Sequence, residues 1–204
     1  MKCISSSTEE RIKEAAKKVF LEKGFEGATT RDIAQEAGLN SALMNYYFRS
    51  KEKLFSEVFE EMLQLFLRGT VEILNKSINL KDKIAELINH DFQMFSSNPS
   101  LAIFVLNELH RNSDLFAKVI PAIRNLHHAE FGRQLQESIE RGEIRPIDPI
   151  NLIPLIIGNI QSIFLCKPMT MQSYDMTEER FNEYAEQQKN LIVSMVTDYL
   201  FLKD

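Results

Sequence analysis

The sequence predicts an all-α protein with a small N-terminal head and a larger helical body. Apolar residues recur at helical spacing along most of the 204 residues, and no run alternates as a half-buried strand would. Asn, Gly and Pro residues cluster between the apolar runs, where helices should end. A hydrophobic content of 44% is enough for a sizeable core. We expect a three-helix helix-turn-helix domain at residues 1–50 and a C-terminal helical bundle at residues 51–204.

The first predicted helix follows Ser7 and has its apolar residues on one face. Ser7 and Glu10 have the spacing of a capping box, and Gly24 is the expected helix end. The residues expected on the buried face are Ile12, Ala15, Ala16, Val19 and Phe20. This helix should support the two shorter helices that follow.

The stretch from Thr30 to Lys51 is the most informative part of the chain. It reads as two short helices joined by a tight turn at Gly38, with Thr30 and Asn40 as their caps. Glycine suits the turn because it adopts a positive φ without a Cβ clash. The residues expected to pack inward are Ile33, Ala34, Ala37, Leu39, Met44 and Tyr47. This pattern is typical of a helix-turn-helix, so DNA binding is the leading hypothesis.

The remaining helices are expected at regular intervals. A fourth helix should start after Ser50 and bury a broad apolar stripe. The residues of that stripe are Leu54, Phe55, Val58, Phe59, Met62, Leu65 and Phe66. Further helices are predicted at residues 83–97, 99–112, 121–141, 151–166 and 177–202. Proline-containing turns, among them Lys167-Pro168, should separate several of them.

Charge is distributed unevenly between the two parts. The net charge of −5 argues against a protein that coats nucleic acid. Residues 1–55 hold ten Lys/Arg against eight Asp/Glu, whereas the remainder holds fourteen against twenty-one. A slightly basic head on an acidic body suits a protein that touches phosphate with one end only.

Several other classes of protein are not indicated. Cys3 and Cys166 lie far apart and have no metal-binding spacing, so neither a disulfide framework nor a zinc site is expected. The N-terminus lacks the apolar core of a signal peptide. The apolar run at residues 147–165 is interrupted by polar residues and prolines, which favours a buried interface helix over a membrane span. We expect a cytoplasmic protein.

No catalytic signature is visible either. The chain has no nucleophile elbow, no glycine-rich phosphate loop and no paired-carboxylate pattern. We therefore expect no enzyme activity and no metal or other cofactor. An enzymatic body carrying an accessory DNA-binding head is the least favoured hypothesis.

The first quarter of the chain resembles the tetracycline-repressor (TetR) family of bacterial transcription regulators. The resemblance rests on KGFEGATTRDIAQEAG followed by LNSALMNYYFRSKEKLF and covers about residues 7–60. It implies a homodimer whose C-terminal helices pair and enclose a pocket for a small molecule. It also implies a palindromic operator that is released when the ligand binds. The alternative is a DNA-binding interaction or architectural protein of the same fold with no small-molecule effector.

Base contacts are expected from the second helix of the motif. An α-helix fits the major groove of DNA, and its N-terminal residues reach the base edges. The candidates are Asn40, Ser41, Ala42 and Asn45. Asn45 can pair with adenine through two hydrogen bonds, at a position where the family often has an aromatic residue. Asn40 can instead act only as a helix cap.

Phosphate contacts are expected from residues that flank these base-contact candidates. The candidates are Thr30, Arg31, Tyr46 and Lys51. Tyr46 should face outward if Tyr47 and Phe48 face the core. Lys51 matches the family's lysine at the start of the fourth helix, although a solvated surface charge is the alternative. Tyr47 is expected in the core.

The body offers weaker candidates for ligand binding. They are Phe92, Phe95, Phe104, Glu108, His127 and Phe131, and they suggest an apolar or aromatic ligand. Asp91 is a further possible polar anchor. The alternative is that most of these aromatic side chains are ordinary core. The last helix and residues 151–165 carry broad apolar faces, from which we expect a four-helix dimer interface.

Overall fold

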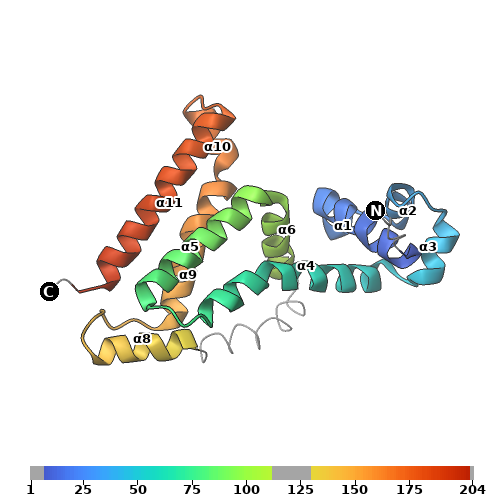
Figure 1. The fold of residues 1–204 in the computed structure, drawn as a ribbon. Coiled ribbons are helices and arrows are strands. Elements are labelled where there is room, and N and C mark those ends of the chain that lie inside the picture. The colour runs from blue at the N-terminus through green and yellow to red at the C-terminus, as the bar shows by residue number, and fades with distance from the viewer. Residues whose placement is uncertain (1–6, 112–129, 203–204) are drawn as a thin grey trace, which may run out of the picture. The chain divides into compact units, whose positions relative to one another are not determined.

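The computed structural model describes residues 7–111 and 130–202, and its regular structure there is helical apart from one isolated bridge between Ile144 and Phe201 (Figure 1). The all-α prediction is confirmed. The helices are α1 Thr8–Gly27, α2 Thr30–Glu36, α3 Ser41–Tyr47, α4 Lys51–Leu74, α5 Leu80–Ser97, α6 Pro99–Arg111, α8 Glu130–Glu140, α9 Pro149–Leu165, α10 Lys167–Ser173 and α11 Glu178–Leu200. The chain forms two compact units, which are described separately. Unit 1 comprises residues 1–66 and 100–112, and unit 2 comprises residues 67–99 and 113–204.

Helix α1 begins as its sequence predicts. The Ser7 hydroxyl accepts from the Glu10 N–H at 3.2 Å, and the Glu10 carboxylate accepts from the Ser7 N–H at 2.7 Å. Gly24 interrupts the helix with a φ of 69°, but helical structure resumes and continues to Gly27. Gly24 therefore marks a kink in α1 and not its end.

The two short helices of the motif are joined as expected. Gly38 adopts a φ of 65° in the turn, and the Asn40 side chain caps α3 by accepting from the Leu43 N–H at 2.7 Å. The cap of α2 is Thr29 and not Thr30, because the Thr29 side chain accepts from the N–H of Asp32. The prediction for the α2 cap was one residue too late.

An aromatic cluster forms the centre of unit 1. Its members are Phe20 and Phe25 from α1, Phe55 and Phe59 from α4, and Phe104 from α6. Neighbouring ring centroids lie between 4.5 and 6.3 Å apart. Helix α6 is thus part of the core that also holds α1. Leu65, which was expected in the buried stripe of α4, is half exposed instead.

Unit 2 is built around α5, which packs against α9 and α11. The ring centroid of Phe164 on α9 lies 5.5 Å from that of Phe92 and 6.0 Å from that of Phe95, both on α5. It also contacts Phe181 of α11 with the ring centroids 6.4 Å apart. The ring cluster formed by these phenylalanines joins the three helices into one packed layer.

In unit 2, α5 and α10 differ most from the prediction. Helix α5 begins at Leu80 because Asn79 caps it through the N–H of Asp82, so residues 80–82 are helical as well. Helix α10 occupies a segment that we expected to be a turn. Pro168 lies in its first turn, where proline is tolerated since no intrahelical N–H bond is required there.

A buried lysine connects α5 to the end of α4. The Lys83 ammonium is fully buried and donates to the Leu74 carbonyl at 3.0 Å. Burial lowers the pKa of this amine, and the charge of Glu130 acts in the opposite direction. Lys83 thereby supplies one of the four last carbonyls of α4 with a donor.

In the described ranges no single helix is long and apolar enough to cross a membrane. Helices α9 and α10 reach the required length and hydropathy only as a pair, and the pair is bent by 54°.

Candidate functional site

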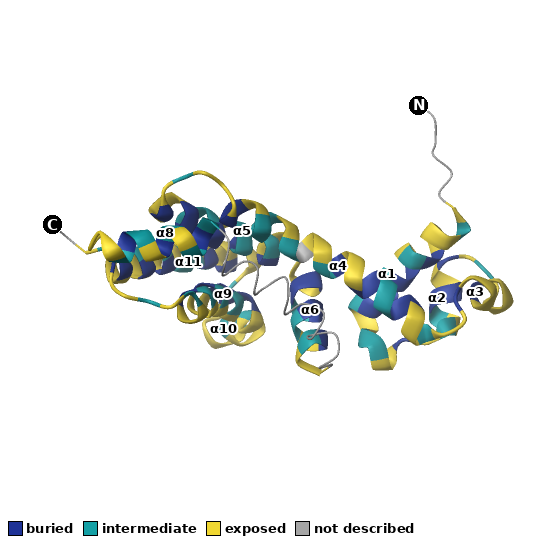
Figure 2. Cartoon of the chain, turned by 90° about the horizontal axis from the view of Figure 1, so that it is seen from below, coloured by how far each residue is buried: buried dark blue, intermediate teal, exposed yellow. Residues whose placement is uncertain are grey.

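Helix α3 presents the residues expected to contact bases. Ser41, Ala42 and Asn45 are all exposed, whereas Met44 is fully buried and fixes the helix to the head. Figure 2 shows that much of α3 is exposed. Asn45 lies one helical turn beyond Ser41 and Ala42, so these side chains share one side of a short helix. This is the arrangement that a major-groove helix requires.

Asn40 combines capping with exposure. Its carbonyl oxygen is occupied by the Leu43 N–H, which fixes the orientation of the amide. The amide nitrogen makes no hydrogen bond with any described residue, so it can still donate to a phosphate or a base. Capping and DNA contact are therefore compatible at Asn40.

The C-terminal end of α3 differs from the prediction. Tyr47 was expected in the core, but it is exposed and its ring lies edge-on to that of Tyr46 at 5.5 Å. The core position is taken by Phe48, one helical turn after Met44. Tyr46 is 80% exposed, so its hydroxyl is available to a phosphate. Tyr47 joins it on the surface as a contact candidate.

The phosphate candidates at the start of α2 differ in their surroundings. Arg31 is exposed and forms no ion pair with the described residues, whereas Thr30 is half-buried. The adjacent Thr29 and Asp32 hold the end of α2 in place through reciprocal hydrogen bonds of 3.0 and 3.1 Å. The Thr29 hydroxyl, assisted by Lys23, lowers the pKa of Asp32 to about 2. The spacing of Thr29 and Asp32 in the sequence was the overlooked sign of this capping box.

Lys51 is more restrained than a surface lysine. Its ammonium donates to the carbonyls of Phe25 and Ala28 at 2.9 and 3.1 Å and lies 4.3 Å from the centre of the Phe25 ring. An ammonium group has three N–H donors, so one remains for a phosphate. Lys51 thus ties the start of α4 to the end of α1.

The turn between α2 and α3 is supported from α1. The Arg11 guanidinium donates to the carbonyl of Ala37 at 2.8 Å. A Cβ on Gly38 would lie 3.6 Å from the same guanidinium, which is an ordinary contact distance. Glycine is therefore required at Gly38 for its positive φ and not for lack of space.

The candidate ligand residues fall into both units. Phe104 and Glu108 belong to unit 1, and Phe92, Phe95 and Phe131 are buried in unit 2. His127 lies outside the described residues. Phe104 packs on the rings of Phe55 and Phe59, and the pair on α5 packs on Phe164.

Glu108 is placed against the kink of α1. It is 6% exposed, and its carboxylate accepts from the Phe25 N–H at 3.5 Å. A Cβ on Gly24 would lie 3.9 Å from the same oxygen. This contact joins α6 to α1 at the position where Gly24 departs from helical backbone angles.

A carboxyl group with a perturbed pKa lies between α4, α5 and α9. Asp91 borders a small apolar cleft of about 10 Å³, large enough for one water molecule. The other lining residues are Thr70, Leu74, Leu87, Ile153, Ile156 and Ile157. Burial raises the pKa of Asp91 to about 7, so a large share of it is protonated at neutral pH.

The neighbouring His90 is closely packed on α4. A Cβ on Gly69 would lie only 2.1 Å from the imidazole, so the ring lies directly on the backbone of the glycine. The buried Nε2 has no hydrogen-bond partner among the described residues. Burial lowers the pKa of His90, with the charge of Glu72 acting in the opposite direction.

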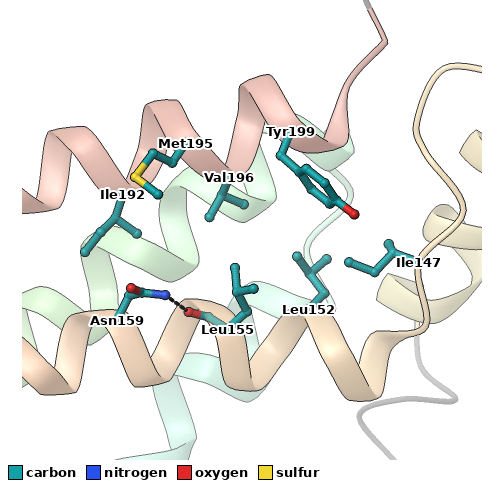
Figure 3. Close-up of a pocket in the computed structure, with 8 residues that line it drawn as sticks. All are labelled: Ile147, Leu152, Leu155, Asn159, Ile192, Met195, Val196 and Tyr199. Atoms are coloured by element: carbon teal, nitrogen blue, oxygen red, sulfur yellow. Dashed lines mark hydrogen bonds between the residues drawn. The ribbon is translucent and has the colours of Figure 1, made fainter.

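An apolar groove of about 260 Å³ runs between α9 and α11 (Figure 3). It is lined by Ile147, Leu152, Leu155, Asn159, Ile192, Met195, Val196 and Tyr199. Leu155, Met195 and Tyr199 are each about half exposed. The groove lies on the two helices for which the sequence predicted a dimer interface.

The head contains a helix-turn-helix whose second helix, α3, is exposed, and the rest of the chain is helical. This combination is typical of a DNA-binding regulator. The sequence model of the tetR family of bacterial regulatory proteins matches residues 12–58. The C-terminal region of YsiA-like proteins matches residues 59–194. Together these matches cover most of the chain. The chain belongs to the tetR family and is a transcriptional regulator.

One relative in sequence and two solved structures illustrate the similarity. The fatty acid metabolism regulator protein of Bacillus subtilis is 27% identical over 168 residues, which cover 81% of this chain and 86% of that protein. The structure of FadR from Bacillus subtilis with stearoyl-CoA has a TM-score of 0.62 and 26% identity, covering 91% and 97% of the two chains. AibR with isovaleryl coenzyme A and operator DNA has a TM-score of 0.70 at 17% identity, covering 93% and 97%.

Proposed function

We propose that this protein is a homodimeric repressor that leaves its operator when it binds a fatty acyl-CoA. The observation that carries the proposal is the similarity of the C-terminal region to the YsiA-like family over residues 59–194. A relative of 26% identity has been crystallised with stearoyl-CoA. An acyl chain also agrees with the apolar ligand expected from the aromatic body. Such a regulator works in the bacterial cytoplasm, where its operator lies.

The proposed DNA contacts come from the surface of α2 and α3. Ser41, Ala42 and Asn45 would face base edges, and the amide of Asn40 would donate beside them. Thr30, Arg31, Tyr46 and Lys51 would contact the phosphates that flank them. Two heads in a dimer would meet two half-sites about one helical turn apart or somewhat more.

The proposed dimer uses α9 and α11. Both helices leave large apolar side chains exposed in a single subunit, among them Leu155, Leu191 and Met195. Monomeric proteins seldom expose apolar patches of this kind without a partner. Four helices, two from each subunit, would bury these side chains against one another.

The proposed switch acts through α6. This helix follows α5 directly, yet it packs within unit 1 and holds the α1 kink through Glu108 and Phe25. An effector bound in unit 2 that favoured a different position of α6 would therefore act on the head. The ligand would shift the population toward a state that does not fit the operator.

The proposal is tested by recovering the operator and then titrating effectors. Genomic fragments retained by the purified full-length protein would identify the operator, and its binding would be followed by fluorescence anisotropy. Stearoyl-CoA is expected to release the DNA at micromolar concentrations, whereas CoA alone and stearate should not. Release by an acyl-CoA of any chain length would support the class of effector and identify the preferred length.

Other outcomes would overturn parts of the proposal. Retention of DNA at saturating concentrations of acyl-CoAs from four to eighteen carbons would exclude this effector class. It would then favour a DNA-binding protein of the same fold without such a ligand. A monomer in sedimentation at tens of micromolar protein would exclude the dimer.

A further inference from the structure

The exposed face of α9 contains a glycine that its own subunit does not explain. Gly158 lies in the interior of this helix, and a Cβ built on it would meet no other atom within 4 Å. Its φ is not in the positive range that favours glycine. Glycine is markedly less favourable than alanine inside a helix. Gly158 therefore lowers the stability of α9, and no contact within the subunit compensates for the loss.

Gly38, Gly69 and Gly142 each have a local reason for lacking a side chain. Gly38 and Gly142 have φ values of 65° and 73°, which most side chains resist. Gly69 has no room for a side chain, since a Cβ there would collide with His90. Neither reason applies to Gly158, which makes this residue a candidate for a contact outside the subunit.

Apart from Asn159, the exposed residues around Gly158 on α9 are small or apolar. Ser162, one helical turn further along, is exposed and also small. Leu155 and Leu165 are exposed on the two sides, and each is about half accessible. The apolar groove between α9 and α11 lies alongside, with Asn159 as its polar lining residue (Figure 3).

We propose that a helix of a second copy of this chain crosses α9 at Gly158, with its backbone close to the glycine Cα. The inference rests on the proposed dimer and adds the position at which its helices cross. Small residues at a crossing allow two helices to approach more closely than the usual 8–10 Å between axes. The missing side chain of Gly158 is the feature that permits this approach.

A second copy fits the surface better than a charged partner does. Helix α9 contains no charged residue, so it offers nothing for an acidic or a basic partner to pair with. Leu191, Met195 and Tyr199 recur every four residues on the exposed side of α11. One subunit thus carries both an exposed helix position without a side chain and a row of large apolar side chains. A two-fold interface brings such features together, because each patch meets its counterpart twice.

Gly158→Ala tests the crossing. The methyl group fits within the subunit, so helicity and the melting of the separated subunit should be unchanged or improved. The same methyl group would meet the second copy. We expect the dimer dissociation constant, measured by sedimentation equilibrium on the full-length protein, to rise by about tenfold or more. Gly158→Leu should weaken the dimer further.

Gly142→Ala is the matched control. Its Cβ also enters open space, but its φ of 73° makes any side chain strained. This variant should melt at a lower temperature and keep the wild-type dissociation constant. Gly158→Ala should therefore weaken the dimer without lowering the melting temperature of the subunit. Gly142→Ala should lower the melting temperature without weakening the dimer.

The outcomes separate this inference from the dimer itself. A Gly158→Leu dimer as tight as the wild type would overturn the crossing and leave the dimer in place. A wild-type protein that is monomeric at tens of micromolar would overturn both.

Discussion

At the scale of single residues, the DNA-binding head depends on side chains whose positions are fixed by short local hydrogen bonds. Asn40 is held by its own helix, and Lys51 by two carbonyls of the first helix. Asn45, by contrast, is exposed and makes no hydrogen bond with any described residue. It is therefore the residue whose contribution should come almost entirely from DNA.

Asn45→Ala should change sequence preference more than overall affinity. If the amide pairs with an adenine, its loss should reduce discrimination at that base pair by about 1–3 kcal/mol. Binding would be measured on operators that vary one position at a time. An equal loss on every variant would instead identify Asn45 as a backbone contact.

Lys51→Met should affect both stability and DNA affinity. The methionine side chain keeps the contact with Phe25, but two carbonyls lose a charged donor. Each lost hydrogen bond should lower the free energy of unfolding by at most about 1.5–3 kcal/mol. If the third donor reaches a phosphate, affinity should fall equally for all sequences and the salt dependence should drop by about one unit per subunit. Lys53→Met, at an exposed position in the same turn, is the control. Loss of stability with an unchanged salt dependence would make Lys51 purely structural.

Asp91 gives the protein a pH-dependent stability. Its pKa is raised to about 7 when folded and returns to its ordinary value near 4 when unfolded. The folded state therefore binds more protons between these values, and the free energy of unfolding should fall as pH rises from 4 to 7. Because Asp91 keeps some exposure, we expect the free energy of unfolding to fall by roughly 1–3 kcal/mol over this pH range.

Asp91→Asn should remove this dependence. Urea unfolding of the variant and the wild type should give similar free energies at pH 5, and the variant should be more stable at pH 8. If the free energies of unfolding of the two proteins changed in parallel with pH across this range, the Asp91 carboxyl would be ionised in the folded state.

At the scale of helices and turns, local signals were sufficient for most of the fold. The Ser7 capping box, the Gly38 turn and the Asn40 cap were all predicted and are confirmed, because each depends on residues within four positions of one another. Errors arose where two local signals competed. Thr29 and Thr30 are both possible caps, and Pro168 suits a turn as well as a helix start.

Positions set by tertiary packing were harder to predict. Tyr47 and Phe48 are adjacent aromatic residues, and only the packing of α3 against the head decides which one is buried. The placement of Glu108 against α1 joins residues 83 positions apart, for which the sequence offers no signal. Aromatic residues of α5 and α6 look alike in the sequence although they belong to different units.

Gly38→Val tests the motif at this scale. A β-branched residue at a φ of 65° should destabilise the head by about 1–2 kcal/mol or more and weaken DNA binding with it. Gly38→Asn should be tolerated better, because asparagine visits this conformation. Loss of DNA binding at unchanged thermal stability would contradict the structural role of the turn.

At the scale of the whole molecule, the connectivity of α6 links two separately packed units. The helix follows α5 of unit 2 in the chain, yet its aromatic and acidic side chains belong to the core of unit 1. Glu108 was a candidate ligand residue, and its contact with Phe25 provides a second possible role. These roles predict different behaviour.

Glu108→Leu distinguishes them. If the residue transmits the response, acyl-CoA affinity should remain within about twofold, while release of the operator should be impaired. Calorimetry with stearoyl-CoA and anisotropy with operator DNA would measure the two quantities. Glu108→Gln keeps an oxygen acceptor for Phe25 and is the control. Lost ligand affinity in the leucine variant with normal coupling would favour the role of ligand anchor.

Residues 200–202 are fastened to the segment between α8 and α9 by two backbone hydrogen bonds. Leu202 donates its N–H to the Glu143 carbonyl, and the Arg145 N–H donates to the Leu200 carbonyl. Ile144 lies between these two bonds and is almost fully buried. This fastening matters to anyone handling the protein in the laboratory. A tag or fusion partner joined directly behind Leu202 would crowd these two hydrogen bonds, so a flexible spacer should precede any such addition.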